Sequence, residues 1–146
     1  MNNIVLCGFM GCGKSTVGKN IARKSGRKFL DMDSYIEEKA GMTVSEIFVK
    51  YGEEKFRDME HDACVELAGL EGLVIASGGG AFTFKRNVEA FKGKDKIVFL
   101  DVPLGIIKSR LKNDTTRPLL QRPDVDMIYI ATDWKHHFPV AKCAME

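Results

Sequence analysis

Residues 8–15 read Gly-Phe-Met-Gly-Cys-Gly-Lys-Ser, a complete G-x-x-x-x-G-K-[ST] motif, and this stretch decides the fold. The apolar run Asn3–Cys7 before it is typical of a buried parallel strand, and Lys14–Ser25 after it has the spacing of a helix. Glycines between a strand and a helix let successive backbone N–H groups point at phosphate oxygens. Lys14 would then reach the phosphates, and Ser15 would ligate Mg²⁺. The motif therefore predicts a nucleoside triphosphate site rather than a chance glycine-rich turn.

The rest of the chain repeats the order of strand and helix. Further strands are expected at Lys28–Asp31, Leu73–Ala76 and Lys96–Leu100. Further helices are expected at Asp33–Lys39, Thr43–Tyr51, Glu53–Leu70, Asn87–Phe91 and Leu104–Lys112. This alternation predicts a single α/β domain over residues 1–146, with a mainly parallel sheet between two layers of helices.

The composition excludes several classes of protein. The 146 residues are 45% hydrophobic and 29% charged, which excludes a disordered chain and a coiled coil. Lys and Arg number 22 against 20 Asp and Glu, and their interleaving argues against a nucleic-acid binder. No apolar run is long enough to span a membrane. The four cysteines are widely separated in the sequence, at Cys7, Cys12, Cys64 and Cys143. This spacing predicts reduced thiols in a cytoplasmic protein rather than a zinc site.

Two carboxylates follow the second expected strand. Asp31 and Asp33 stand where Lys28–Asp31 ends, and ligands of parallel sheets bind beyond the carboxyl ends of the strands. One carboxylate would hold the water shell of the metal, and the other would accept the proton of an acceptor hydroxyl. The alternative role for Asp33 is to cap the helix that begins beside it. The neighbouring phosphate loop favours the chemical role.

Glycines and arginines supply the remaining candidates. The stretch at 77–81, Ser-Gly-Gly-Gly-Ala, follows a strand directly, so a ligand could approach its backbone closely; a flexible turn is the alternative. Arg57 would bind an anion, or else form a surface ion pair with Glu60 three residues on. Residues 113–124, which include Arg117, are expected to form a lid that closes over the phosphates.

Five motifs together resemble the shikimate kinase family. They are GFMGCGKST at 8–16, FLDMDSYIE at 29–37, GEEKFRDME at 52–60, IASGGGA at 75–81 and TTRPLL at 115–120. Their order and spacing match the family across residues 3–124. The resemblance implies a P-loop NTPase fold and ATP-dependent phosphorylation of the 3-hydroxyl of shikimate, in the chorismate pathway to aromatic amino acids.

A nucleotide site is implied by this resemblance. Arg110 would pack on the adenine of ATP, and Arg117 would reach the phosphates. Mg²⁺ would be held by Ser15 and, through water, by Asp31. Lys14 and Arg117 would act on the transferring phosphoryl group. The phosphates would lie on six consecutive residues, Gly11, Cys12, Gly13, Lys14, Ser15 and Thr16.

An acceptor site is implied as well. Asp33 would hold the ring hydroxyls of shikimate and serve as the base. Arg57, braced by Glu60, would pair with the shikimate carboxylate, because a guanidinium is a good bidentate partner for it. The other side of the substrate would be lined by Gly78, Gly79 and Gly80. Neither nucleic acid nor a membrane is expected as a partner.

The tail at 125–146 departs from the family pattern. The family carries a second substrate arginine there, whereas this chain reads Trp-Lys-His-His-Phe at 134–138, with His136 as the positional stand-in and His137 as the alternative. Because the sequence stops at Glu146, the family's final edge strand and C-terminal helix are expected to be absent. The hypothesis is that the phosphate site persists while adenine binding and turnover weaken. A monomer is expected unless another subunit covers the exposed edge.

Two alternative functions stay open beside this one. The first is a catalytically impaired, nucleotide-binding remnant of a kinase. The second is a P-loop kinase that acts on another small hydroxylated metabolite, which would have a different acceptor pocket. A GTPase-like switch would need a guanine-reading N-K-x-D tetrad, and the sequence contains none.

Overall fold

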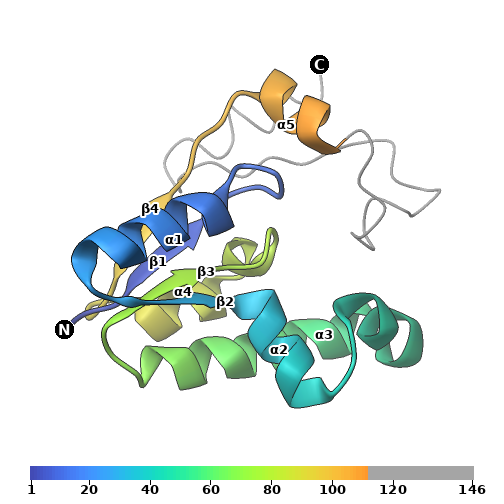
Figure 1. Cartoon of the computed structure of the whole chain (residues 1–146). Helices are drawn as coiled ribbons and strands as arrows, with labels where there is room; N and C mark the ends of the chain where they lie inside the picture. Colours follow the sequence, from blue (N-terminus) through green and yellow to red (C-terminus); the bar gives the residue numbers. More distant parts are fainter. Residues whose placement is uncertain (112–146) are drawn as a thin grey trace.

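The computed structural model describes residues 1–111, and a four-stranded parallel sheet stands at its centre (Figure 1). The strands are β1 (Ile4–Cys7), β2 (Lys28–Asp31), β3 (Leu73–Ala76) and β4 (Lys96–Phe99), in the order β2-β3-β1-β4. Every neighbouring pair is parallel, with Val5 of β1 opposite Ile75 of β3 and Ile97 of β4. The strands therefore bring their carboxyl ends to one edge of the sheet, where ligands of such sheets bind.

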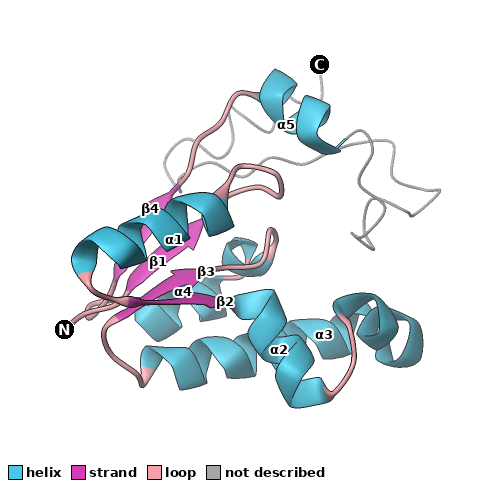
Figure 2. Cartoon of the chain, viewed as in Figure 1, coloured by secondary structure: helices cyan, strands magenta, loops and turns pink. Residues whose placement is uncertain are grey.

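Helices cover both faces of the sheet (Figure 2). They are α1 (Lys14–Ser25), α2 (Met32–Ala40), α3 (Val44–Ala68), the 3₁₀ turn η1 (Ala81–Thr83), α4 (Lys85–Phe91) and α5 (Leu104–Leu111). α1 lies on one face, and α3 and α4 lie on the opposite face. The predicted arrangement of a parallel sheet between two helical layers is confirmed.

Alternate residues of the central strands fill two separate cores. Val5 and Ile75 are fully buried in the cluster that packs against α3 and α4, whereas Leu6 and Val74 are fully buried in the cluster that packs against α1. Strands that are covered on both faces need apolar residues at consecutive positions. This requirement explains why β1 and β3 read as continuous apolar runs in the sequence.

The ends of the helices follow local signals in the sequence. α1 ends at Gly26, whose φ of 67° is the left-handed conformation that favours glycine. At the start of α3, Glu46 N donates to Thr43 Oγ1 at 3.2 Å and Thr43 N donates to Glu46 Oε2 at 2.7 Å, so these two residues form a capping box. Within α3, Gly52 has non-helical backbone angles (φ 83°, ψ 172°). The predicted break between two helices at this point is confirmed.

Some predicted boundaries move by one or two residues. α4 begins at Lys85, ahead of the predicted Asn87, because the chain turns into it directly from η1. α3 ends at Ala68 and β4 ends at Phe99, each slightly short of the prediction. The expected lid at 113–124 and the tail at 125–146, with the expected loss of a final strand and helix, lie outside the described residues.

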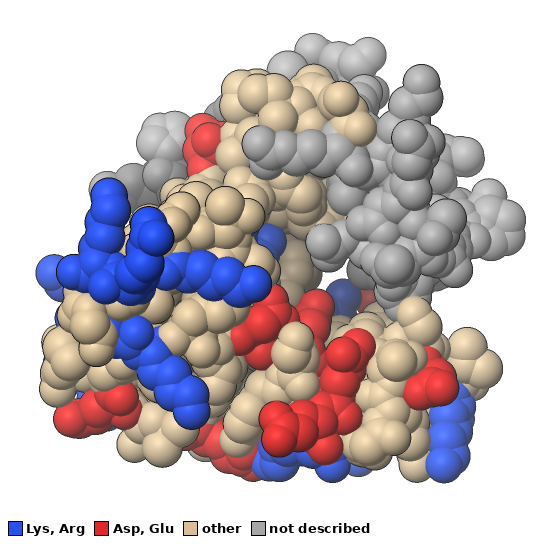
Figure 3. All heavy atoms as spheres, viewed as in Figure 1, with Lys and Arg blue, Asp and Glu red and all other residues tan. Residues whose placement is uncertain are grey.

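Charge is spread unevenly over the surface. Residues 1–30 contain no Asp or Glu, and basic side chains gather over α1 (Figure 3), where Lys19, Arg23 and Lys24 are exposed. The charges are therefore more clustered than their interleaving in the sequence suggests, because the fold brings this acid-free stretch to one face. No helix within residues 1–111 is both long and apolar enough to cross a membrane.

Candidate active site

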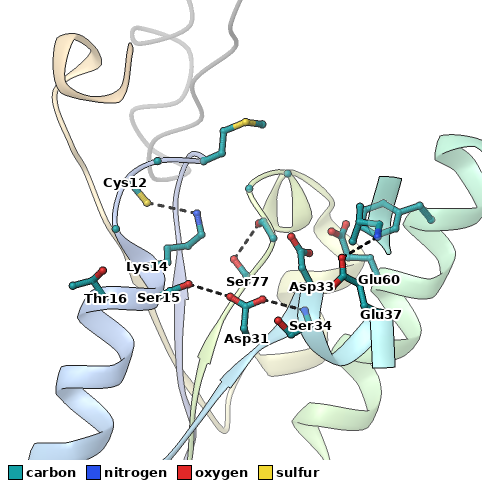
Figure 4. A pocket seen from close by; sticks show the side chains of 18 of the residues that line it. Cys12, Lys14, Ser15, Thr16, Asp31, Asp33, Ser34, Glu37, Glu60 and Ser77 are labelled. Atoms are coloured by element: carbon teal, nitrogen blue, oxygen red, sulfur yellow. Dashed lines mark hydrogen bonds between the residues drawn. The ribbon is translucent and has the colours of Figure 1, made fainter. Parts of the chain in front are cut away.

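A cavity of about 840 Å³ lies at the carboxyl ends of β1, β2 and β3 (Figure 4). Its walls come from the phosphate loop at residues 8–15, the start of α2, the middle of α3 and the glycines after β3. The predicted site residues that line it are Gly11, Cys12, Gly13, Lys14, Ser15, Thr16, Asp31, Asp33, Arg57, Gly78, Gly79 and Gly80. A volume of this size suits a small-molecule ligand.

The phosphate loop folds around the side chain of Lys14. Gly8, Gly11 and Gly13 have φ angles of 146°, 83° and 92°, which residues with a Cβ rarely adopt. Lys14 Nζ donates to the carbonyl oxygens of Gly8 at 2.8 Å and Phe9 at 3.0 Å. No side chain in the described part caps the start of α1. The amino end of this helix therefore carries no side-chain cap from the described residues, which is typical of a helix that begins at an anion site.

Ser15 and Asp31, the two predicted metal residues, are in contact. Ser15 Oγ donates to Asp31 Oδ2 at 3.0 Å, and Figure 4 shows this bond between the phosphate loop and the end of β2. The other oxygen, Oδ1, accepts the backbone N–H of Ser34 at 3.1 Å. Asp31 is thus the N-cap of α2, which corrects the alternative that gave this role to Asp33. Asp33 stands two residues further on, within the first turn of α2.

This pair of residues fits a Mg²⁺ ion but does not enclose one. A hydroxyl and a carboxylate are the hard oxygen ligands that Mg²⁺ prefers. Within residues 1–111 no group of three or more His, Cys, Asp or Glu side chains could hold a metal by itself. A Mg²⁺ ion held here would therefore take most of its ligands from water and phosphate, as is usual for nucleotide-bound magnesium.

Asp33 faces Glu60 across the backbone of Gly78. A Cβ added to Gly78 would come within 2.9 Å of both Asp33 Oδ1 and Glu60 Oε2. Two carboxylates therefore approach this one position closely, and only a residue without a side chain leaves room for both. Gly78 is thus a close-approach position for two side chains of the protein, whereas the expected approach of a ligand to this backbone stays a prediction.

Arg57 forms a largely buried ion pair. Its Nη1 donates to Glu60 Oε1 at 3.0 Å, with the two side chains 11% and 1% exposed, and its Nη2 lies 3.5 Å from Glu53 Oε1. Burial raises the pKa of Glu60, and the Arg57 guanidinium opposes that rise. The predicted pairing of Arg57 with Glu60 is present. The alternative of a surface ion pair is wrong, because this side of α3 forms part of the cavity wall.

The glycines after β3 also contact both halves of the cavity. A Cβ on Gly79 would lie 3.2 Å from Met10 N in the phosphate loop. A Cβ on Gly80 would lie 3.0 Å from Arg57 Nη2. Two consecutive glycines of this loop therefore contact the phosphate loop and Arg57 respectively.

Aromatic lining residues escaped the sequence analysis. Phe48 and Phe56 line the cavity, and their ring centroids are 4.9 Å apart. Phe56 stands at a helical spacing that also suits a core residue, and it belongs to the core cluster too. Glu37 also lines the cavity while its Oε1 accepts the Val44 N–H at 2.9 Å. Glu37 and Phe56 lie inside the quoted motifs at 29–37 and 52–60, and this position was the signal that could have found them.

The three described cysteines are buried free thiols, in agreement with the expectation. Burial raises the pKa of Cys7 to about 11 and that of Cys64 to about 12, so both remain neutral thiols near pH 7. Cys12 lies in the cavity wall with 5% of its surface exposed.

The remaining predicted residues stay predictions. Arg110 lies on α5, and its side chain is outside the described part of the structure. Arg117, His136 and His137 also lie outside the described residues. The described geometry therefore brings together the residues predicted for the phosphate, metal and acceptor sides, and the roles of these residues stay predictions.

A phosphate loop that faces a carboxylate and an arginine across one cavity, at the carboxyl edge of a parallel sheet, defines a phosphotransferase of the P-loop class. The family model described as shikimate kinase matches residues 10–141. The curated shikimate kinase of Geobacter sulfurreducens is 49% identical over 119 residues, which cover 82% of this chain and 66% of that protein. The one of Sulfurihydrogenibium sp. is 47% identical over 123 residues, which cover 84% and 74%. The chain belongs to the shikimate kinase family.

Solved structures support the same assignment. Shikimate kinase from Acinetobacter baumannii in complex with shikimate superposes with a TM-score of 0.80 at 44% identity, over 84% of this chain and 69% of that one. The structure of shikimate kinase from Aquifex aeolicus gives 0.75 at 33% identity, over 97% and 80%. The predicted family and P-loop fold are confirmed. Neither alternative function is favoured by these comparisons. The chain spans about two thirds of the length of the Geobacter relative (66%).

Proposed function

We propose that this chain transfers the γ-phosphoryl group of ATP to the 3-hydroxyl of shikimate, giving shikimate 3-phosphate and ADP. The observation that carries the proposal is the shared cavity, in which the phosphate loop faces Asp33 and Arg57 across the glycines after β3. An anionic nucleotide and a carboxylate-bearing acceptor need two separate cationic positions, and Lys14 and Arg57 supply them.

The phosphate side positions the group to be transferred. The backbone N–H groups of Gly11–Thr16 bind the phosphates, and the Lys14 ammonium turns from loop carbonyls to phosphate oxygens. Ser15 and Asp31 would hold Mg²⁺, which neutralises phosphate charge when bound. Arg117 would complete this side, and Arg110 would pack on the adenine.

The acceptor side orients shikimate and removes a proton. Arg57 pairs with the carboxylate of the substrate, while Asp33 accepts a hydrogen bond from the 3-hydroxyl. The hydroxyl oxygen then bonds to the γ-phosphorus as the bond to the bridging oxygen of ADP breaks, and the hydroxyl proton passes to Asp33. Gly78, Gly79 and Gly80 line the substrate, with His136 on its carboxylate side. The proposal places the chain in the cytoplasm, as a monomer unless another subunit covers an edge of the sheet.

The proposal is tested with the purified 146-residue chain. ADP formation is followed with ATP, Mg²⁺ and shikimate, and again with gluconate in place of shikimate. Shikimate-dependent turnover with no response to gluconate is expected. Separate calorimetric titrations of shikimate and of ADP accompany the assay. Binding of both ligands without turnover would instead identify the impaired remnant, and binding of ADP alone would identify a kinase for a different acceptor.

Replacing Asp31 with asparagine is expected to raise the Mg²⁺ concentration needed for half-maximal activity by about 10- to 100-fold. Asparagine is as good an N-cap as aspartate, so α2 keeps its bond from Ser34 N to the side chain while the charge facing Ser15 is lost. Ser15→Ala is expected to act in the same direction. Activity is measured as a function of Mg²⁺ at saturating ATP.

The control for this prediction is Asp31→Ala, which removes both the charge and the cap. It is expected to shift the Mg²⁺ requirement as Asp31→Asn does and to lower the free energy of unfolding by about 1 kcal/mol besides. An unchanged Mg²⁺ requirement in Asp31→Asn would exclude Asp31 from the metal site.

A further inference from the structure

The start of α4 holds Arg57 at two points. The Phe84 ring centroid lies 5.2 Å from the Arg57 guanidinium carbon, within the range of a cation–π contact, and the ring of Phe56 lies 5.5 Å away. Arg86 Nη2 donates to the backbone carbonyl of Arg57 at 3.1 Å, and its guanidinium also bonds Asp58 Oδ1. We call the contacts of Phe84 and Arg86 with Arg57 the α4 clamp.

Phe84 has no place in the hydrophobic cores of the described residues. It is 37% exposed and packs into neither core cluster. Phe82, two residues earlier, stacks on the fully buried Phe91 with ring centroids 5.9 Å apart and packs against the larger core. Phe82 therefore contributes to the stability of the core, whereas the side chain of Phe84 contacts Arg57.

The α4 clamp is fixed firmly to the rest of the site. The fully buried Asn87 donates from Nδ2 to the carbonyl of Ala81 at 2.8 Å, and its Oδ1 lies 2.9 Å from Nδ1 of His61 on α3. Ala81 directly follows the glycines that line the cavity. The first turn of α4 is thus tied to α3 on one side and to the glycine loop on the other, so the Phe84 ring stays at a set position relative to Arg57.

We propose that Phe84 is a positioning residue for the carboxylate of the acceptor, acting through Arg57. An arginine side chain loses much rotamer freedom when it pairs with a carboxylate. A ring that already holds the guanidinium in place removes part of that loss before the substrate arrives, and this raises affinity without adding a contact to the substrate. The proposal rests on the proposed function, in which Arg57 pairs with the shikimate carboxylate.

The test compares three variants of the full chain. Phe84→Leu removes the π face, and we expect the KM for shikimate to rise about three- to tenfold, with kcat and the KM for ATP changed less than about twofold. Phe84→Tyr keeps the face and is expected to restore the wild-type KM. Phe82→Leu is the matched control, because it lowers the thermal midpoint without touching Arg57 and leaves the KM for shikimate unchanged. An unchanged KM in Phe84→Leu, or an equal rise in Phe82→Leu, overturns the proposal.

A second readout separates this proposal from the proposed function. The NMR resonance of the Arg57 Hε proton senses the ring current of Phe84 and needs no substrate. It is expected to move in Phe84→Leu and to stay in place in Phe82→Leu. A wild-type chain that neither binds nor phosphorylates shikimate refutes the proposed function, whatever this resonance does. A resonance that stays in place in Phe84→Leu refutes the α4 clamp, whether or not the chain is an active kinase.

Discussion

Replacing Asp33 with asparagine is expected to lower kcat for the phosphorylation of shikimate by about 10²- to 10⁴-fold. The amide cannot accept the proton of the 3-hydroxyl, whereas its size and shape match those of the carboxylate. It still fits beside Gly78, where a Cβ would come within 2.9 Å of Asp33 Oδ1. Binding geometry is therefore retained, and the KM for shikimate is expected to change far less than kcat. Steady-state kinetics at saturating ATP measure both constants.

Asp62→Asn supplies the matched control for this variant. Asp62 is an exposed carboxylate on α3 and does not line the cavity, so its loss is expected to leave kcat unchanged. Calorimetric binding of shikimate to Asp33→Asn confirms that the site is still assembled. If Asp33→Asn kept more than about a tenth of the wild-type kcat, proton transfer to this residue would contribute too little to be the catalytic step assigned to it.

Gly78→Ala is expected to lower kcat/KM for shikimate by about 10²-fold, although it adds a single methyl group. That methyl group would lie 2.9 Å from Glu60 Oε2 as well as from Asp33 Oδ1. Glu60 is 1% exposed and bonded to Arg57, so it has little room to withdraw. Asp33 and the Arg57 pair must therefore shift together. A displacement of about 1 Å at a reacting group is enough for a loss of this size.

The affinity for ADP tells misplacement of the site apart from unfolding. Gly78→Ala is expected to keep this affinity, because the phosphate loop is built from residues 8–15 and, among the three glycines after β3, it is Gly79 whose added Cβ would meet this loop. Gly105→Ala adds the same methyl group on α5, where no described residue outside its own helical turn comes within 4 Å, and is expected to keep wild-type kinetics. A wild-type kcat/KM in Gly78→Ala would contradict this prediction, because it would show that the two carboxylates can move aside without loss of activity.

The phosphate loop and its flanking elements could be predicted from the sequence because their signals are local. A glycine-rich motif between a β-branched strand and an amphipathic helix predicts a single local structure, a strand followed by a loop and a helix. The bounds predicted for α1, β2 and β3 agree with the structure. Gly26 and the Thr43–Glu46 capping box mark helix ends through backbone chemistry that needs no tertiary contact.

Features set by packing between distant segments could not be predicted in the same way. Arg57 and Glu60 have the same spacing in a surface pair as in a buried one, and only the packing of α3 decides between them. Helical periodicity places Phe56 on the inner side of α3 but does not say that this side also lines a cavity. Asp31 and Asp33 are both suitable caps, and the choice depends on where β2 ends.

Asp31 connects the two halves of the site through a single carboxyl group. One of its oxygens accepts from Ser15 of the phosphate loop, and the other holds the first turn of α2, on which Asp33 stands. Under the proposed function, a tilt of that carboxyl group would move Asp33, and a movement of Asp33 would tilt the carboxyl group. Binding on the nucleotide side and binding on the acceptor side would then be coupled. Such coupling is reciprocal. If bound ATP raised the affinity for shikimate by some factor, bound shikimate would raise the affinity for ATP by the same factor.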